Sequence, residues 1–141
     1  MAQLGNSRKA YITLGSSGTP TTWLSGEQSN SFNRTAEAIE VSDKSTEWAQ
    51  FITGKKGATA EITVYADDTT GEPQYNCIKA LHTGATVRVF IGVLNGSSAS
   101  QGDVFTAIVT AVSDTNDNGS VASRTISLTA TGAVTHYPTI S

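Results

Sequence analysis

The feature that most constrains the fold is a strict two-residue alternation of apolar and polar side chains in the middle of the chain. Over Ala58–Tyr65 every second residue is apolar, and a second run with the same period lies at Thr86–Leu94. Successive side chains of a β-strand point to opposite faces, so this period predicts strands with one buried face. The apolar positions of the two runs are Ala58, Ala60, Ile62, Val64, Val87, Val89, Ile91 and Val93.

Other segments also have the composition of strands. The tract Gln28–Val41 is polar and alternates weakly, which is typical of a strand that is exposed or lies at an interface. The run Asp114–Gly119 contains Asn-Gly and separates two long segments, and this predicts a hairpin turn. The four further predicted strands are Lys9–Leu14, Gln28–Val41, Asp103–Ser113 and Val121–Thr131.

One segment has the signals of a helix instead. Over Glu72–Thr83, Pro73 fits the first helical position and Gly84 fits the position just past the end. An apolar stripe at helical spacing is predicted to face the core, and it consists of Tyr75, Cys77, Ile78 and Leu81. The sequence therefore predicts a mainly β fold, with two packed antiparallel sheets (a sandwich or barrel) and one flanking α-helix.

Length and charge limit the organisation and the partners. The chain has 141 residues, which fits a single domain, and we expect the ends Met1–Arg8 and Ala133–Ser141 to be arms with little to bury. Nine Lys and Arg against 12 Asp and Glu give a net charge of -3, so no general attraction to nucleic acid is expected. No stretch has the pattern of a signal peptide or the length of a membrane anchor.

The candidate sites for chemistry all have simpler interpretations. Asp114–Gly119 matches the first half of a calcium loop, but position twelve is Thr125, which cannot supply the bidentate carboxylate. Gly54–Gly57 lacks the spacing of a phosphate loop and is interpreted as a basic turn. His82 and His136 have no second ligand at metal spacing, and Cys77 is interpreted as a small buried hydrophobe. We therefore expect no catalytic residue, metal or cofactor.

The segment Ser42–Gly57 has no clear period, and we expect an irregular loop there. Trp48 stands inside it among polar residues. That side chain either folds back onto the core or anchors a partner, since Trp is enriched at the energetic centres of interfaces.

Residues 31–65, SFNRTAEAIEVSDKSTEWAQFITGKKGATAEITVY, resemble the major tail tube proteins of long-tailed phages. In that family a polar strand ends in an aliphatic-acidic step, a loop with Trp or Phe and a basic-Gly turn follow, and an alternating strand with an Asp after it comes next. The small-residue end SLTATGAV at Ser127–Val134 continues the likeness, which covers nearly the whole chain. The matching parts are Ile39-Glu40-Val41-Ser42, Trp48, Lys55-Lys56-Gly57, Ala60–Tyr65 and Asp67.

The resemblance implies a structural virion protein and not an enzyme. Six copies would form a ring, and stacked rings would make a hollow tail tube through which double-stranded DNA passes into the host without specific binding. The implied partners are the tape measure, tail terminator and baseplate or initiator proteins, with assembly in the host bacterial cytoplasm. A partly apolar loop makes a poor free surface, so we expect Ser42–Gly57 to contact the next ring or a neighbouring subunit. The candidate contact residues are Asp43, Trp48, Phe51, Lys55 and Lys56.

Other functions remain open at the sequence level. The same fold could serve a gene-transfer particle, a contractile bacteriocin or a secretion tube. A β-sandwich carbohydrate-binding or adhesion module is the alternative from another class, but such modules expose several aromatics on a flat face, whereas Trp23 and Trp48 stand alone. A small β-rich enzyme is disfavoured because no catalytic constellation is present.

Overall fold

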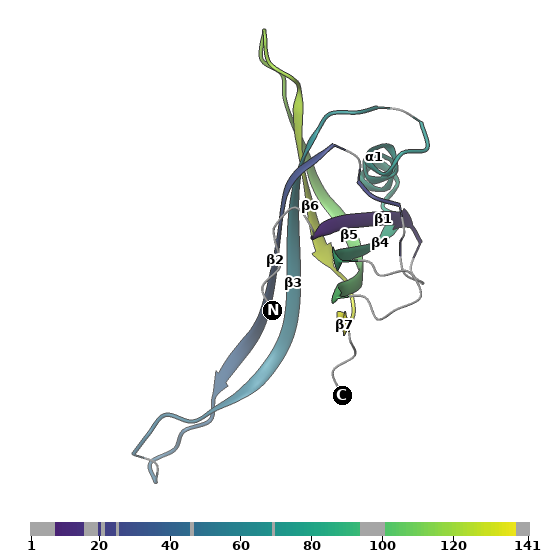
Figure 1. Cartoon of the computed structure of the whole chain (residues 1–141). Coiled ribbons are helices and arrows are strands. Elements are labelled where there is room, and N and C mark those ends of the chain that lie inside the picture. The colour runs from purple at the N-terminus through teal and green to yellow at the C-terminus, as the bar shows by residue number, and fades with distance from the viewer. Residues whose placement is uncertain are drawn as a thin grey trace.

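The computed structural model describes residues 8–15, 20, 22–24, 26–45, 47–68, 70–93 and 101–137. Within these ranges the chain forms seven strands and one helix (Figure 1). The elements are β1 (Lys9–Leu14), β2 (Glu27–Glu40), β3 (Phe51–Tyr65), α1 (Pro73–Thr83), β4 (Thr86–Val93), β5 (Gln101–Thr115), β6 (Ser123–Ala130) and β7 (Thr135–Tyr137).

The strands form one antiparallel sheet in the order β1-β4-β5-β6-β3-β2, with β7 added to β5. The two outermost strands approach each other, because the Ala10 backbone N–H donates to Glu27 Oε1 at 3.0 Å and Asn30 Nδ2 donates to the Arg8 carbonyl at 3.2 Å. The prediction of a mainly β antiparallel fold with one flanking helix is confirmed. The two expected layers are joined in one hydrogen-bonded sheet that curls into a barrel, because β5 pairs with both β4 and β6.

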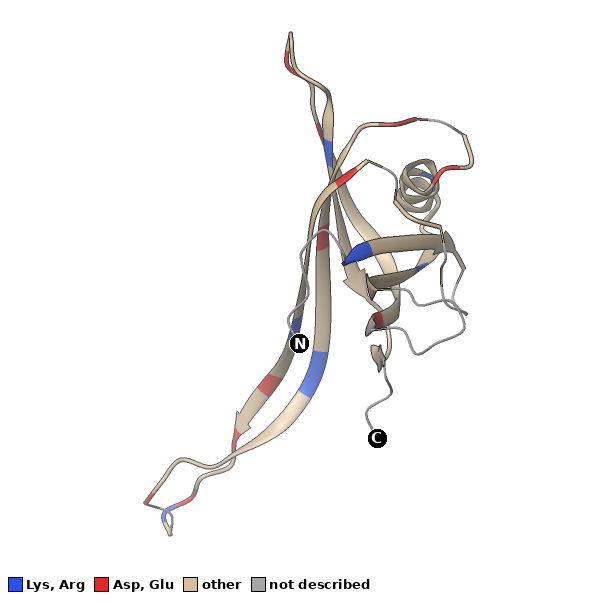
Figure 2. Cartoon of the chain, viewed as in Figure 1, with Lys and Arg blue, Asp and Glu red and all other residues tan. Residues whose placement is uncertain are grey.

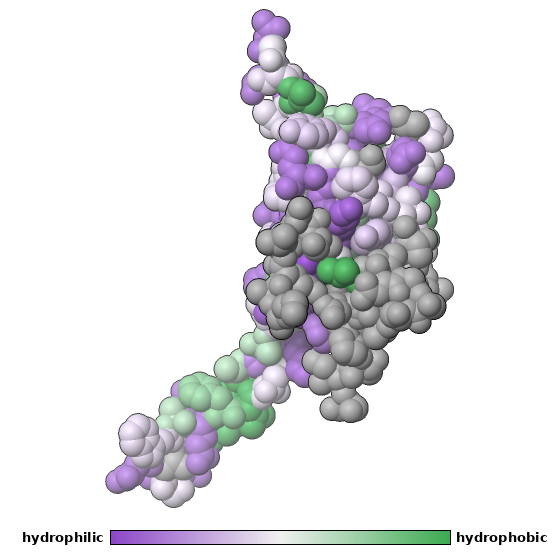
Figure 3. Space-filling model, viewed as in Figure 1, coloured by the Kyte–Doolittle hydropathy of each residue, from purple (hydrophilic) through white to green (hydrophobic). Residues whose placement is uncertain are grey.

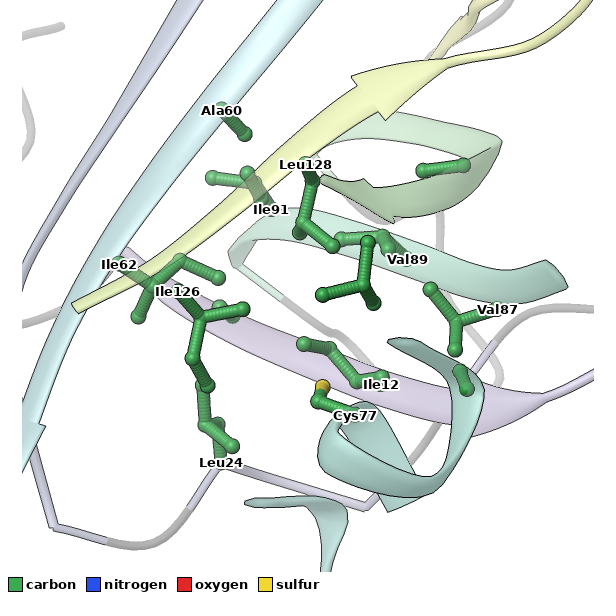
Figure 4. Packing of buried hydrophobic residues seen from close by; sticks show 14 of the residues in the cluster. Ile12, Leu24, Ala60, Ile62, Cys77, Val87, Val89, Ile91, Ile126 and Leu128 are labelled. Atoms are coloured by element: carbon green, nitrogen blue, oxygen red, sulfur yellow. The ribbon is translucent and has the colours of Figure 1, made fainter. Parts of the chain in front are cut away.

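The predicted alternation sets the core. In β3 the apolar series from Ala58 to Val64 is buried, and in β4 Val87, Val89 and Ile91 are buried (Figure 4). Residues of β1, β5, β6 and α1 complete one cluster inside the barrel. The apolar period of the sequence therefore predicts which face of these strands is inside. Val93 is only partly buried, and Leu94 lies outside the described residues.

The helix begins and ends close to the predicted residues, but its buried face differs from the predicted stripe. Gly84 ends it in the left-handed conformation with φ 76°, which glycine adopts without a steric penalty. Tyr75 is exposed, and Ile78 and Leu81 are only partly buried. Of the predicted stripe only Cys77 belongs to the face that the helix buries against the barrel, and this face also holds the large polar side chain of Gln74. That face consists of Pro73, Gln74, Cys77 and Ala80.

The prediction of an irregular loop over Ser42–Gly57 is wrong for its second half. β3 begins at Phe51, and Gly54–Gly57, expected to be a basic turn, lies within this strand. The pairing with β2 runs from Thr35↔Gly57 to Glu40↔Phe51 and overrides the local turn signals of Gly and Lys. A register shift between Ala36 and Ala38 takes up the one extra residue of β3 as a β-bulge.

The expected arms at the two ends fall mostly outside the described residues. Residues 1–7 and 138–141 are not described. Within the expected C-terminal arm, Thr135–Tyr137 form β7, which pairs with Val104, Asp103 and Gly102 of β5.

Candidate assembly surfaces

A two-stranded ribbon projects from one end of the barrel, and the β5–β6 hairpin projects from the opposite end (Figure 1). The ribbon comprises residues 35–57, and we call it the arm. It leaves the barrel because β6 pairs with β3 only from Thr59 to Tyr65, so that earlier residues of β3 pair with β2 alone. The arm is thus held in place by its own ladder and not by the core.

The arm carries a cluster of exposed apolar side chains, visible as the hydrophobic zone of the ribbon in Figure 3. Trp48 is 83% exposed, so within this chain it does not fold back onto the core. Contiguous exposed apolar surface marks interaction sites in soluble proteins. The cluster consists of Ile39, Val41, Trp48, Phe51 and Ile52.

The geometry of the arm depends on one glycine. Ile39 lies opposite Ile52, and its side chain covers Gly54, where an added Cβ would lie 2.8 Å from Ile39 Cδ1. The bulge beside Gly54 interrupts the ladder at this point. A glycine at this position therefore lets the Ile39 side chain lie flat on the ribbon.

All five predicted contact residues lie on the arm, and all are exposed. Asp43 Oδ1 accepts hydrogen bonds from the Ser45 hydroxyl at 2.5 Å and the Ser45 backbone N–H at 2.8 Å. These two bonds lower the pKa of the Asp43 carboxyl, the side-chain bond most strongly, and keep it ionised. Ser42 Oγ accepts from the Gln50 N–H at 2.6 Å and closes the loop at its base. The structure thus brings Asp43, Trp48 and Phe51 to the distal end, and Lys55 and Lys56 nearer the barrel.

A second surface is the outer face of the strands β5, β6, β3 and β2. Cross-strand pairs align short polar side chains in rows, such as Ser31↔Glu61↔Ser127 and Asn33↔Thr59↔Thr129. A shallow hollow of about 340 Å³ lies on it. We call this surface the hydroxyl face. The register also places Tyr65, Ile108 and Ala111 on it, and its polar residues are Ser29, Ser31, Asn33, Thr59, Glu61, Thr63, Thr110, Ser113, Thr125, Ser127 and Thr129. Glu61 is the one ionisable side chain among these polar residues.

The same four strands end in two open edges. β4 pairs with β5 only as far as Ile108, so the stretch from Val109 to Thr115 has β6 on one side only. In the described part of the chain, the outer edge of β2 meets β1 only near Glu27 and Asn30 and is open beyond them. Open backbone edges of this length are templates for pairing with another chain.

A groove lies where the arm meets the barrel, with a volume of about 500 Å³. Asp103 on β5 is 3% exposed and accepts two hydrogen bonds from Arg34 Nη1, both at 2.9 Å, while His136 Nδ1 lies 2.9 Å from its Oδ1. Arg34 also lies over the Phe32 ring at 5.3 Å. No local sequence pattern predicts this cluster, because Arg34 and Asp103 are 69 residues apart.

The residues considered for chemistry are apart from one another. His82 is exposed in the last turn of α1, whereas His136 lies at the groove. Burial raises the pKa of the Cys77 thiol to about 12, so it is a protonated core side chain and not a nucleophile. Asp114, the first position of the calcium-like run, instead accepts a hydrogen bond from Arg124 Nε at 2.6 Å. Across the described ranges no three potential metal-ligating side chains cluster, and no helix there is long and apolar enough to cross a membrane.

Comparison with known proteins finds relatives by structure alone, since no family model and no curated protein matches the sequence. A chain from the tail of an empty gene transfer agent particle, refined with C6 symmetry, superposes with a TM-score of 0.75 at 14% identity, over 96% of this chain and 98% of that one. The tail tube of SPP1 gives 0.63 at 15% identity, over 92% and 76%. The tube-terminating cap of the anti-feeding prophage gives 0.59 at 17% identity, over 94% and 89%. The chain therefore has the fold of the tail tube proteins, as its sequence resemblance implied.

Proposed function

We propose that this chain is the structural, non-enzymatic subunit of a tail tube, in a long-tailed phage or a phage-derived particle, and that six copies form each ring. The observation that carries the proposal is the agreement of fold over nearly the whole of both chains with a tail of C6 symmetry. The exposed edges and the apolar arm support it, because each is a poor surface for a protein that works alone.

The open edges supply a way to close the ring. In the order β5-β6-β3-β2 the strands alternate in direction, so β2 of one copy runs antiparallel to β5 of the next when the copies rotate about an axis along the strands. The edge of β2 pairs with the open stretch of β5 from Val109 to Thr115. A head-to-tail contact of this kind closes into a ring when the rotation fits, and six is the number that the C6 tail supports.

The hydroxyl face then lines the channel. It is the polar side of the four paired strands, turned away from the core. It offers hydroxyl groups, an amide and the Glu61 carboxylate to passing DNA, and none of its named residues is a cation. Phosphate groups find no counter-charge there, so double-stranded DNA slides through without being held.

The arm and the chain ends make the contacts between rings. Asp43, Trp48, Phe51, Lys55 and Lys56 contact a subunit of the next ring, and the ends 1–8 and 133–141 lie across subunit junctions. The tube meets the tape measure protein inside, a tail terminator at one end and a baseplate or initiator protein at the other. The subunit is assembled into the virion in the host cytoplasm.

Negative-stain microscopy of the particles that contain this chain tests the proposal, with the tails separated from the heads and their proteins identified by mass spectrometry. We expect hollow tubes in which this chain is the most abundant protein. Tails whose tubes lack the chain would overturn the proposal. A monomer in solution is compatible with it, because some tube subunits assemble only on an initiator complex.

A further inference from the structure

The groove at the base of the arm is built to receive a side chain. Its wall includes the short apolar residues Ala36, Ala58 and Val134, and its volume of about 500 Å³ lies within the roughly 300–1,000 Å³ of pockets that hold a buried group. Ala58 is buried and belongs to the barrel, while Ala36 is exposed and belongs to the arm. The groove therefore joins a rigid wall to the start of the ribbon.

The rim of this groove is basic. Arg34, Lys56 and His136 line it, and the side chains of Arg34 and His136 are 56% and 41% exposed. The one carboxylate at the groove, Asp103, is buried and already bonded to Arg34 and His136. Arg34 donates both of its hydrogen bonds to Asp103 from Nη1, and more than half of the Arg34 side chain stays exposed. The rim thus favours an acidic partner.

The distal loop of the arm has the complementary chemistry. Over Val41–Gln50 it carries two carboxylates, Asp43 and Glu47, and one cation, Lys44, which gives the loop a net charge of -1, and Glu40 at the end of β2 adds a third carboxylate beside it. Trp48 follows Glu47 in the sequence and is the most exposed large apolar side chain in the described part of the chain. A large aromatic next to an acidic residue fits an apolar groove with a basic rim.

A copy cannot fill its own groove. The ladder between β2 and β3 holds the arm extended from Ala36↔Lys56 to Glu40↔Phe51. Five residue steps from Ala36 to Val41 span about 17 Å at the rise of a strand. Trp48 lies beyond that point, so it reaches a groove only on another molecule.

Resting on the proposed function, we infer that the loop of one copy docks in the arm-base groove of another, with Trp48 in the groove and Glu47 beside Arg34 and Lys56. The distal loop and the groove are different surfaces of the chain, so a copy whose loop is bound to one neighbour can still bind the loop of another neighbour in its own groove. Such a contact repeats without limit along one direction. It supplies a stacking contact between rings that is distinct from strand pairing within a ring.

Cross-linking tests which residues meet. Two variants are made, Ala36→Cys at the groove and Ala49→Cys beside Trp48, and equal amounts are assembled together into tubes. Cys77 is fully buried and does not compete for a maleimide reagent. A short bis-maleimide should join the two variants into a dimer in tubes. The control pairs Ala49→Cys with Thr70→Cys, an exposed site outside the groove, and should give at least tenfold less dimer.

Charge reversal tests the recognition itself. Lys56→Glu and Glu47→Lys should each lower the yield of tubes at least tenfold at low salt, and the double variant should recover most of it. Lys79→Glu is the control, because Lys79 is an exposed cation on α1 that neither lines the groove nor belongs to the proposed contact residues of the arm. Unchanged thermal unfolding of the soluble variants separates lost docking from lost folding.

The outcomes distinguish the two proposals. Tubes that form normally but give no cross-link between the Ala36→Cys and Ala49→Cys variants overturn the docking inference and leave the tail tube function standing. A yield of tubes from Lys56→Glu as high as that from Lys79→Glu does the same. If the wild-type chain is found in no tube, neither in the particles nor after purification, both the proposed function and the docking inference are wrong.

Discussion

At the scale of single residues, polar side chains in the core decide how the helix and the hairpin are held. Arg124 on β6 is 5% exposed and bonds Asp114 at 2.6 Å, Asp68 at 3.0 Å and Gln74 Oε1 at 3.0 Å. Gln74 in turn donates to the Tyr65 carbonyl at 2.8 Å. Burial alone lowers the pKa of the Arg124 guanidinium, but the bonds to Asp114 and Asp68 outweigh it and raise the pKa. We call this group of Arg124, Asp114, Asp68 and Gln74 the Arg124 hub, and it joins α1 to the sheet.

Removing the hub should destabilise the fold. Arg124→Met leaves Gln74 and two carboxylates without their common donor, and we expect the free energy of unfolding to fall by about 2–3 kcal/mol. Asp68→Asn is the control, since the Asp68 side chain is 77% exposed and its ion pair contributes less than about 1 kcal/mol. Urea unfolding followed by circular dichroism measures both. Equal losses in the two variants would contradict the assignment of Arg124 as the central group.

The buried thiol predicts a pH dependence. The pKa of Cys77 rises from 9.0 to about 12 in the folded chain, so above pH 9 the unfolded chain loses a proton that the folded chain keeps. Stability is therefore full below pH 9 and falls as the pH rises toward 12. Between pH 8 and 10 the wild type should lose about 1 kcal/mol more than Cys77→Ala, measured by urea unfolding. Parallel losses in the two proteins would contradict a buried neutral thiol.

At the scale of elements, the sequence predicts a strand best where one face of that strand is buried in the barrel. The alternation in Ala58–Tyr65 correctly predicts β3, because burying each apolar side chain in the core stabilises the strand in this register. It fails for Phe51–Gly57, where both faces are exposed and only the register with β2 makes the strand. The groove was equally beyond prediction, because Arg34, Asp103 and His136 come from three strands and meet only in the fold. The proposed contact residues of the arm were chosen because Ser42–Gly57 is a partly apolar stretch without strand period, and their place on a projecting ribbon was not predicted.

The distal loop should be dispensable for folding and required for assembly. Glu40 and Phe51 face each other across the ladder, so a two-residue Asn-Gly turn can replace Val41–Gln50. Those of the removed residues that the structure describes are exposed or half-buried, and we expect the free energy of unfolding to change by less than about 1 kcal/mol while tube formation is lost. Microscopy and urea unfolding measure the two effects.

The control for this replacement keeps the loop. Ser45→Ala removes the hydroxyl bonded to Asp43 and should still assemble. Normal tubes from the shortened chain would show that the loop makes no essential contact.

At the scale of the whole molecule, one sheet supplies three surfaces with separate roles. Its inner face and α1 form the core, its hydroxyl face is mostly polar, and its arm and two long edges are exposed. Figure 2 marks charged residues of both signs along the arm, on the strands of the barrel and at the opposite end of the molecule. Sequence patterning predicted the fold class and the helix. It could not predict which strands line a channel, because that depends on how copies pair.

A map of the assembled tube at side-chain resolution tests the central claim most directly. We predict a sixfold hollow tube with this chain in its wall, β2 of each copy paired with β5 of the next, and the row Ser31, Glu61 and Ser127 facing the channel. A tube in which this face is turned outward, or whose channel is lined mainly by Lys and Arg, would contradict the account.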